Sequence, residues 1–529
     1  MNPSGLRPRA AASAMTKWEL QVLLPKRKLF NGHANRYFSQ CGPRCRESLP
    51  SIAPRPSLNI KHIRQNPELY SQNCLERNYK AQSDSPFKIV KLFEKWLLSQ
   101  KSTRGLREKS NAIRTQLSHS RTFSGIEGEA QDGQGKQKTL LVEEAQDLKK
   151  QLSAIEALEG QLNNEIEDLA AELPNLTSDQ TPRGDEPKVL GYINEHSNPP
   201  STSHDRIWRN HVHIGTEFDL LDFAGAATTS GWGWYYLKNE AALLEQALIQ
   251  YAVRVAMQHG FTVVTPPSMV YSHIAAACGF RPRDQSGEQQ VYDTQQSERD
   301  QEKGKPSHSL AGTAEIPLAG MKADAAVDRA DLPIQVVGPS RCYRAEAGAR
   351  GVETKGLYRV HEFTKVEMFA WTAQGGEDEA FLSMLSIQQE ILQNLGLHCR
   401  ILEMPSTDLG ASAVRKQDIE AFFPSRREKD GGWGEVTSTS ICTDYQTRRL
   451  NTRVRNPAGS QTKMDFPSTV NGTALAVPRV LAALLENGWD EKEVCVRIPE
   501  VLWPWMHGMQ IIKKKRRLEA PSKHQETMG

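Results

Sequence analysis

The stretch RCYRAEAGARGVETKGLYRVHEFTKVEMF, residues 341–369, predicts the end of one strand, a loop and a second strand. The first strand covers residues 335–343, and the loop after it is rich in Gly, Ala and Arg and carries Arg344 and Glu346. The second strand covers residues 358–369, and its alternation places these side chains on one face: Arg359, His361, Phe363, Lys365 and Glu367. A solvated face has the same alternation. The pairing of the two strands, however, aims arginines and carboxylates at one place, which suits a polyphosphate beside a small zwitterion.

This stretch resembles motif 2 of the class II aminoacyl-tRNA synthetases, in the form found in seryl-tRNA synthetases. Three further stretches resemble motifs of that family and follow its order: the Thr-x-Glu serine-binding loop at LAGTAEIPLAG (310–320), the Glu-Val/Ile-Ser-Ser strand at EVTSTSICTDYQTRRL (435–450) and motif 3 at NGTALAVPRVLAALLENG (471–488). The resemblance extends from about residue 58 to about residue 508. It implies an α+β fold, in which helices flank a mostly antiparallel sheet and a long helical hairpin precedes it.

The bulk composition is compatible with a large protein of more than one domain. A length of 529 residues favours two domains with extensions, and 38% hydrophobic residues can supply a sizeable core. The formal net charge of +3 means that any RNA-binding charge is local. The 8 cysteines show no zinc-site spacing, so we expect reduced thiols. No apolar run is long enough to span a bilayer, and we expect a soluble protein with no membrane contact.

The first 56 residues have a composition of their own, with ten basic residues against two acidic ones. An Arg-rich, Ala- and Ser-containing segment that is poor in acids, without a long apolar run, predicts a mitochondrial transit peptide. We therefore expect a protein of the mitochondrial matrix. A disordered basic tail on a cytoplasmic protein is the alternative.

Residues 57–185 are predicted to form a helical hairpin. A helix over 87–118 is followed by a polar, Gly-rich turn at about 120–138. A heptad seam then runs from Leu141 to Leu173, with Leu158 filling a gap, and ends at Pro174. Periodicity alone favours a dimerisation coiled coil, whereas the resemblance implies an arm that contacts tRNA(Ser). Exposed basic residues of the hairpin are candidate phosphate contacts, with a solvated face as the alternative: Arg104, Arg107, Lys109, Arg114, Lys149 and Lys150.

Residues 186–508 are predicted to form the catalytic domain. A helix over 241–259 and a strand over 261–264 precede a Pro-Pro pair and resemble motif 1, which implies a homodimer. Residues 281–309 form a polar insertion that we expect to be a surface loop. Residues 509–529 are expected to form a disordered basic tail, and a nuclear localisation signal is the alternative for that basic run.

The resemblance implies that ATP binds between motifs 2 and 3. Arg344 would bridge the α-phosphate and the serine carboxylate, because a guanidinium donates several directed bonds; an ion pair with Glu346 is the alternative. Phe363 would stack on adenine, and Arg479 would cover the other face of that ring. A core aromatic and a solvated arginine are the alternatives. Arg344, Glu435 and Arg479 are the catalytic candidates. The whole ATP set is Arg344, Ala345, Glu346, Arg359, Val360, Phe363, Glu435, Val436, Thr437, Ser438 and Arg479.

Glu435 and Ser438 offer oxygen ligands for Mg²⁺ bound together with ATP. Strict alternation along a strand places these two side chains on opposite faces. We therefore expect a local irregularity at this point, or a backbone role for one of the residues.

L-Serine selection requires a carboxylate for the ammonium group and a polar partner for the hydroxyl, and Glu367 can serve both. This sequence departs from the family at two positions. Ala314 lies where the family has serine in the Thr-x-Glu loop, and Ala345 lies where the family often has serine in motif 2. His361 and Lys365 receive no role and are expected to be structural. The implied serine-binding set is Thr313, Ala314, Glu315, Arg344, Glu367, Asn471 and Thr473.

Two other functions compete with a seryl-tRNA synthetase. One is an inactive paralogue that retains the arm and binds RNA or a protein; the presence of Arg344, Glu367 and Arg479 speaks against it. The other is a class II synthetase for a different amino acid, against which the long hairpin and the NGTALAVPR form of motif 3 argue.

Overall fold

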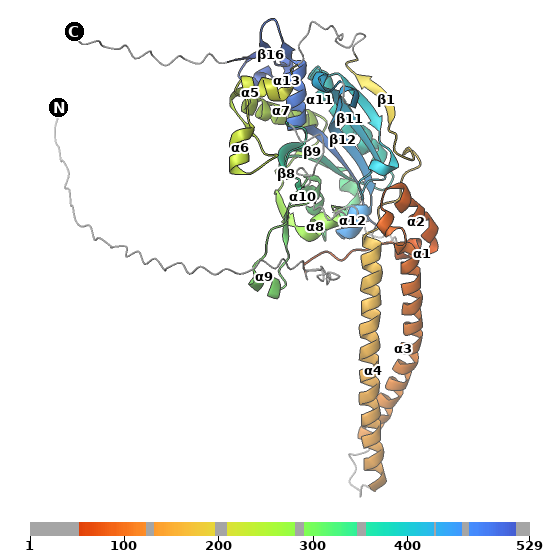
Figure 1. Cartoon of the computed structure of the whole chain (residues 1–529). Helices are drawn as coiled ribbons and strands as arrows, with labels where there is room; N and C mark the ends of the chain where they lie inside the picture. The colour runs from red at the N-terminus through yellow and green to blue at the C-terminus, as the bar shows by residue number, and fades with distance from the viewer. Residues whose placement is uncertain are drawn as a thin grey trace, which may run out of the picture. The chain divides into compact units, whose positions relative to one another are not determined.

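The computed structural model describes residues 52–122, 132–195, 209–280, 290–345, 356–427, 430–456 and 465–514 (Figure 1). Residues 1–51 of the predicted transit peptide and Glu346 lie outside the described residues, as do the tip of the hairpin and the first part of the predicted insertion. All six cysteines in the described ranges are buried free thiols, as expected. Among the helices of these ranges, none is both long and apolar enough to cross a membrane.

The predicted helical hairpin is present and its helices are longer than expected. After α1 (Ile60–Gln65) and α2 (Pro67–Glu76), the long helices α3 (Ser85–Thr122) and α4 (Asp132–Ala171) run side by side (Figure 1). The predicted turn over 120–138 is too long, because the two helices extend into it from both ends. A helix that is already nucleated continues through weak helix formers at modest cost.

The seam between the two helices differs from the predicted one at a single layer. Leu158 is 48% exposed, whereas Glu159 is buried and continues the 4,3 spacing between Ile155 and Leu162. Its carboxylate accepts hydrogen bonds from Ser99 Oγ (3.2 Å) and Thr103 Oγ1 (2.8 Å) across the hairpin. A buried carboxylate that is bonded in this way fixes one register between the helices, since a shift would leave it unpaired.

The base of the hairpin is tied to the rest of the chain by two arginines. Arg77, fully buried, donates to the backbone carbonyls of Asn175 and Gly410. Arg449 donates to the carbonyl of Ala171 at 3.3 Å and to that of Leu173 at 3.4 Å. The bond from Arg449 to Ala171, the last residue of α4, satisfies a carbonyl that the helix itself leaves unpaired.

The centre of the structure is an eight-stranded sheet in the order β1-β10-β11-β12-β14-β9-β8-β4, which confirms the α+β prediction. All neighbours pair antiparallel except β4 and β8. The strands are β1 (Lys188–Ile193), β4 (Thr262–Val263), β8 (Ile334–Tyr343), β9 (Glu362–Thr372), β10 (Cys399–Glu403), β11 (Arg415–Phe422), β12 (Trp433–Thr443) and β14 (Ser468–Ala476).

Helices α7 (Asn239–Gln258), α11 (Glu377–Asn394) and α13 (Val477–Asn487) cover one face of this sheet (Figure 1). Their apolar sides form the main hydrophobic core with the strands beneath them. The helix predicted over 241–259 is therefore confirmed as α7. Because one face of the sheet is sealed by apolar helices, a ligand site is left to the other face.

Shorter elements complete the described chain. The helices are α5 (His211–Glu217), α6 (Phe223–Thr229), α8 (Ser272–Ala277), α9 (Glu298–Glu302), α10 (Glu315–Gly320) and α12 (Tyr445–Arg449). The strands are β2 (Leu221–Asp222), β3 (Tyr236–Leu237), β5 (Met269–Tyr271), β6 (His308–Leu310), β7 (Ala326–Asp328), β13 (Arg453–Arg455), β15 (Trp489–Asp490), β16 (Cys495–Arg497) and β17 (Ile511–Lys513).

Two boundaries predicted from composition are wrong. The tail was expected from residue 509, but β17 pairs with β16 and buries Ile512. The insertion was expected to be a surface loop through residue 309, but Ser309 is buried and β6 pairs with β5. In both places a few apolar residues within a polar run find a strand partner, which local composition does not report.

The strand predicted over 358–369 is displaced. Strand β9 begins at Glu362 and ends at Thr372, while Tyr358 to Val360 form a bend before it. Arg359 and His361 therefore precede the strand, whereas Phe363, Lys365 and Glu367 lie on one face of it.

We predict that Glu159→Ala loosens the hairpin locally, because the buried hydroxyls of Ser99 and Thr103 lose their shared acceptor. The expected loss is about 1–3 kcal/mol in the free energy of local opening, measured by hydrogen exchange of the amides in α3 and α4. Glu156→Ala is the matched control, since Glu156 is exposed and pairs with Arg107 at the hairpin surface. Equal protection in the two variants would contradict the assigned role of Glu159.

Candidate functional site

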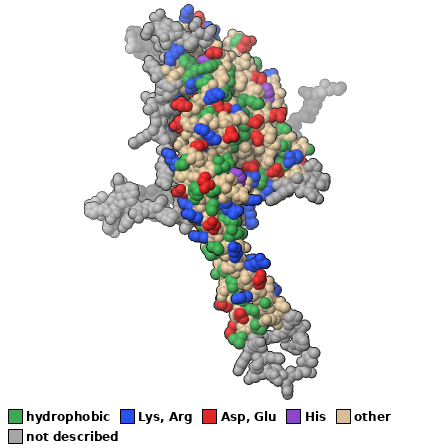
Figure 2. Space-filling model, turned by 90° about the vertical axis from the view of Figure 1, so that its right-hand side faces the viewer, with side chains coloured by type: hydrophobic (Ala, Val, Ile, Leu, Met, Phe, Trp, Pro, Cys, Tyr) green, Lys and Arg blue, Asp and Glu red, His purple; other side chains and the backbone are tan. Residues whose placement is uncertain are grey.

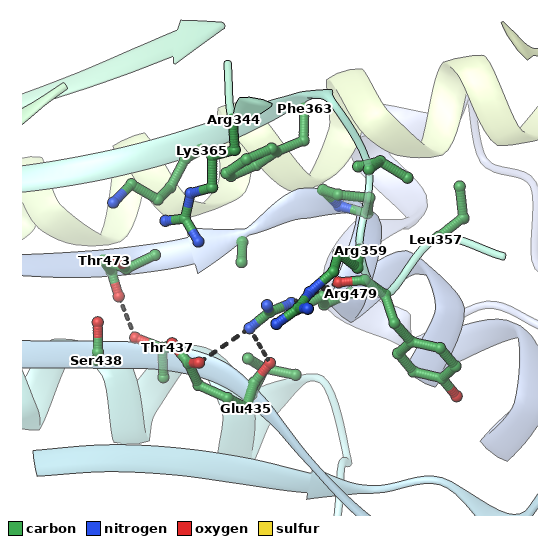
Figure 3. Close-up of a pocket in the computed structure, with 15 residues that line it drawn as sticks. Arg344, Leu357, Arg359, Phe363, Lys365, Glu435, Thr437, Ser438, Thr473 and Arg479 are labelled. Atoms are coloured by element: carbon green, nitrogen blue, oxygen red, sulfur yellow. Dashed lines mark hydrogen bonds and ion pairs between the residues drawn. The ribbon is translucent and has the colours of Figure 1, made fainter. Parts of the chain in front are cut away.

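A cleft lies on the sheet face opposite the helices (Figure 3). Its walls come from β9, β12 and β14, from the bend before β9 and from the start of α13. Most of the residues predicted to bind ATP line it together: Arg344, Arg359, Val360, Phe363, Glu435, Val436, Thr437, Ser438 and Arg479. The structure thus brings motifs 2 and 3 and the Glu435 strand to one place, as the sequence predicted.

Arg479 and Glu435 form an ion pair at the floor of the cleft (Figure 3). Arg479 Nη1 donates to the backbone oxygen of Glu435 at 3.0 Å and to its carboxylate at 3.1 Å. Desolvation raises the pKa of the Glu435 carboxyl, but Arg479, Lys416 and Arg344 outweigh that effect and lower the pKa to about 2. The Glu435 side chain is nevertheless 41% exposed, toward the cleft. An ionised and accessible carboxylate is therefore present at neutral pH.

The expected irregularity on the Glu435 strand is present. Between β11 and β12 the register shifts, so that Ile419 pairs with Thr437 but Glu420 pairs with Glu435. The extra residue, Val436, has its side chain in the main core, while Glu435 and Ser438 are both half-buried and line the cleft. This bulge places two oxygen-bearing side chains three residues apart on the same side of the strand. Glu435 and Ser438 are thus the described residues best placed to hold a divalent cation in the cleft.

Arg344 and Phe363 form the opposite wall. The guanidinium carbon of Arg344 lies 5.1 Å from the centre of the Phe363 ring. Phe363 is nearly buried against Cys342, Val360 and Tyr235. A ring held in this way can present one face to a planar ligand, next to a fixed positive charge.

Next to Lys365 and Thr473, which line the cleft, Glu367 is fully buried in the middle of β9. One carboxylate oxygen, Oε2, accepts from Lys365 Nζ at 2.7 Å and from Thr473 Oγ1 at 3.3 Å. The other oxygen, Oε1, is buried and has no hydrogen-bond partner among the described residues. A buried acceptor without a donor is costly, and a bound polar ligand would satisfy it.

Glu315 stands next to Glu367 and receives two amide donors, Gln446 Nε2 at 2.6 Å and Asn471 Nδ2 at 3.2 Å. Burial, and after it the Glu367 carboxylate, raise the pKa of Glu315 to about 8. At neutral pH Glu315 is therefore mainly protonated. Thr313 Oγ1 accepts from the Glu315 N–H at 3.4 Å, and Ala314 is fully buried between them.

Three residues without a predicted functional role contact residues of the predicted site or line the cleft. Lys365 was expected to be structural, yet it lines the cleft and pairs with Glu367; the signal available was an opposite charge two residues away on the same strand face. His361 Nδ1 lies 3.0 Å from the Arg344 carbonyl oxygen and 2.7 Å from the Tyr292 hydroxyl. Gln446 bonds Glu315 from α12, and no local pattern announces that contact.

The predicted tRNA contacts all lie exposed on α3 and α4. Arg104 pairs with Glu108 at 3.2 Å and Arg107 with Glu156 at 3.0 Å, both at the surface. Figure 2 shows Lys and Arg side chains interspersed with acidic ones along the hairpin and gathered where it joins the sheet domain. These residues are accessible to a polyanion, and their role stays a prediction.

The sheet order, the flanking helices and the cleft that joins three arginines to the Glu435 carboxylate define a class II aminoacyl-tRNA synthetase. Residues 295–488 match the family described as tRNA synthetase class II core domain (G, H, P, S and T). Residues 58–177 match the seryl-tRNA synthetase N-terminal domain.

Individual relatives show which class II synthetase this chain resembles. The mitochondrial serine–tRNA ligase of Saccharomyces cerevisiae is 40% identical over 69% of this chain and 78% of its own length. The serine–tRNA ligase of Rhodopirellula baltica is 36% identical over 86% of this chain and 99% of its own length. The crystal structure of seryl-tRNA synthetase from Pyrococcus horikoshii complexed with ATP superposes with a TM-score of 0.72 at 31% identity, covering 87% of this chain and all of that one. The chain belongs to the seryl-tRNA synthetases.

The raised pKa of Glu315 leads to a prediction about stability. Between about pH 4.5 and about pH 8 the unfolded chain has lost this proton while the folded protein retains it, so stability falls as the pH rises through this window. Glu315→Gln removes that dependence. The melting temperature of the variant, relative to the parent, should rise from pH 5 to pH 8 in ligand-free differential scanning fluorimetry. A difference that stays constant across the window would contradict the assigned titration.

Proposed function

We propose that the cleft binds ATP and L-serine side by side, joins them as seryl-adenylate and transfers the seryl group to tRNA(Ser). The observation that carries this proposal is the combination of three cleft arginines with a buried carboxylate beside them. Arg344, Arg359 and Arg479 line the cleft, and Lys365 and Thr473, which also line it, contact Glu367, whose Oε1 is unpaired among the described residues. The relatives named as serine–tRNA ligases, and the ATP complex of one of them, support it.

The nucleotide would lie between the two walls. Phe363 stacks on one face of adenine and Arg479 covers the other, while Glu346 accepts from the adenine amino group and Val360 contributes its backbone. Arg359 and Arg479 neutralise the terminal phosphate, and Arg344 bridges the α-phosphate and the serine carboxylate. Planar guanidinium groups suit these roles, because each can bond two oxygens at once.

In the first step a serine carboxylate oxygen attacks the α-phosphorus, the bond to the bridging oxygen breaks and pyrophosphate leaves. In the second step a terminal ribose hydroxyl of tRNA attacks the seryl carbonyl carbon, and AMP and the hydroxyl proton are released. Both steps develop negative charge on oxygens, which fixed cationic donors stabilise. No nucleophilic side chain is required for either step.

Mg²⁺ fits the residues on the bulge of β12. Glu435 supplies an ionised carboxylate and Ser438 a hydroxyl on the same side of the strand, and hard cations prefer such oxygen ligands. When bound there, the ion supplies charge neutralisation to the phosphates. Because Glu435 already pairs with Arg479, this chain keeps the ligand carboxylate pointed into the cleft.

Serine would bind at Glu367, with Thr313, Ala314, Glu315, Asn471 and Thr473 around it. Glu367 Oε1 accepts from the serine ammonium or hydroxyl, while Oε2 stays occupied by Lys365 and Thr473. A protonated Glu315 limits the negative charge beside it. Alanine is rejected, because it would leave buried polar groups unpaired.

The partners and location follow from further features. Apolar side chains around motif 1 form an exposed surface, including Met269, Tyr271 and Met321, which fits a homodimer contact.

The basic residues of the hairpin would contact tRNA phosphates. The basic N-terminal composition and the mitochondrial relatives support the mitochondrial matrix as the location.

The test of this function is ATP–pyrophosphate exchange with each amino acid in turn, which should occur with serine only. Glu367→Ala should abolish the serine-dependent exchange, because the serine ammonium and hydroxyl lose their acceptor. Retained exchange at normal serine affinity would contradict the assignment. Glu362→Ala is the matched control, since Glu362 lies on the same strand, pairs with Arg341 and does not line the cleft.

Met321→Glu should convert a dimer into a monomer, because it places a charge in the exposed apolar surface near motif 1. Size-exclusion chromatography with light scattering measures the mass. Leu382→Glu is the control, since Leu382 is 63% exposed on α11, away from that surface. A dimer that withstands Met321→Glu would place the interface elsewhere.

A further inference from the structure

One of the residues that line the cleft, Tyr358, is held at both its backbone and its hydroxyl by the same helix. Tyr358 lies in the bend before β9, and its carbonyl oxygen accepts from Arg479 Nε at 3.1 Å. Its hydroxyl donates to Glu486 Oε1 at 3.2 Å. Arg479 and Glu486 are seven residues apart on α13, which is two helical turns, so they project from the same face. The backbone and the ring of Tyr358 are thus fixed to one rigid element.

Glu486 is itself firmly held, although its side chain is fully buried. Its Oε1 accepts from the His211 backbone N–H at 3.0 Å and from His211 Nδ1 at 2.9 Å. Its Oε2 accepts from the Ser425 N–H at 3.3 Å. Burial opposes ionisation, but the hydrogen bonds from His211 outweigh it and lower the pKa of Glu486. The carboxylate is a saturated anchor with no oxygen left for a ligand.

His211 closes the arrangement onto the residue before Tyr358. Its Nε2 accepts from the Leu357 N–H at 3.0 Å, which leaves the proton on Nδ1, where it is donated to Glu486. Gly356 permits this approach: it has a φ of +83°, and a Cβ there would lie 2.2 Å from His211 Nε2. The Tyr358 hydroxyl is therefore bonded directly to the buried Glu486 carboxylate, and the Leu357 amide is linked to the same carboxylate through His211.

The Tyr358 ring has no room to turn. It packs edge-on against His211, with ring centres 4.8 Å apart, and edge-on against Phe423, also at 4.8 Å. Arg426 lies over the ring at 4.6 Å. A side chain confined in this way transmits the position of its hydroxyl to its own backbone carbonyl.

We propose that Tyr358, Glu486 and His211 are positioning residues that set the direction of Arg479 in the nucleotide cleft. Arg479 Nη1 is held by Glu435, and the Tyr358 carbonyl is the contact that holds its Nε. Two separate anchors fix the plane of a guanidinium, whereas one leaves it free to rotate. A preoriented guanidinium loses less conformational freedom when a ligand binds. This inference rests on the proposed binding of ATP by Arg479.

Tyr358→Phe tests the arrangement, because it removes the hydroxyl and leaves the packing of the ring. Binding of a non-hydrolysable ATP analogue, measured by isothermal titration calorimetry, should weaken roughly threefold to tenfold, as expected for the loss of one buried hydrogen bond. In pyrophosphate exchange the KM for ATP should rise by the same factor, while the KM for serine stays unchanged. Glu486→Gln should shift the same constant, since the amide nitrogen that replaces one carboxylate oxygen cannot accept a hydrogen bond, and both oxygens of Glu486 are acceptors.

The matched control is Tyr251→Phe. The Tyr251 hydroxyl accepts from Asn394 Nδ2 at 3.1 Å between α7 and α11, away from the cleft. This variant loses a buried tyrosine hydroxyl and should bind the analogue as the parent does. A general loss of stability would affect both tyrosine variants.

A double-mutant cycle with Arg479→Ala decides whether Tyr358 acts through Arg479. In that background Tyr358→Phe should have no further effect on analogue binding. An additive effect, or unchanged binding in both Tyr358→Phe and Glu486→Gln, would overturn the positioning role. If the parent binds the analogue but shows no serine-dependent exchange, the proposed function fails while the cycle still tests this inference. If the parent does not bind the analogue at all, both are overturned.

Discussion

The ion pair between Lys365 and Glu367, buried in the middle of the central sheet, is the constraint on which the site depends. Two charges at this depth are tolerated only with close geometry and with further hydrogen bonds around them. Thr473 supplies one such bond, and the elevated pKa of Glu315 removes a second negative charge from the same space. The one oxygen of Glu367 left unpaired among the described residues is the place where a small polar ligand gains most. The stability of the sheet and the proposed recognition of serine therefore depend on the same cluster.

The rest of the architecture protects this cluster and gives it a cleft. Apolar helices seal one face of the sheet, so charged side chains can face only the other. Helix α13 contributes to both the core and the cleft. Its buried residues pack in the core, while Arg479 near its start lines the cleft. The bulge at Val436 has a comparable effect on β12, since it turns Glu435 and Ser438 to the same side. Strands β9 and β12 and helix α13 thus hold Phe363, Glu435, Ser438 and Arg479 of the proposed nucleotide site.

Much of this could be predicted from the sequence. The motifs located the residues of the cleft, and the conflict between strict alternation and the roles of Glu435 and Ser438 predicted the bulge. Errors arose where long-range contacts override local pattern. Leu158 was placed in the hairpin seam, but the heptad register buries Glu159, which finds donors on the other helix. The tail and the insertion were read from polar composition, although Ile512 and Ser309 are buried by strand partners distant in sequence.

The sequence by itself determined the family, the order of the motifs and the residue types at the cleft, because these depend on side-chain chemistry at set spacings along the chain. The tertiary structure alone decided how those residues are held. Lys365 acquires its role from the depth at which it meets Glu367, and Gln446 from a helix that packs beside Glu315. Tyr358 acquires its role from the two ends of α13. Such roles depend on desolvation and on distances between segments far apart in the chain, and local sequence carries neither quantity.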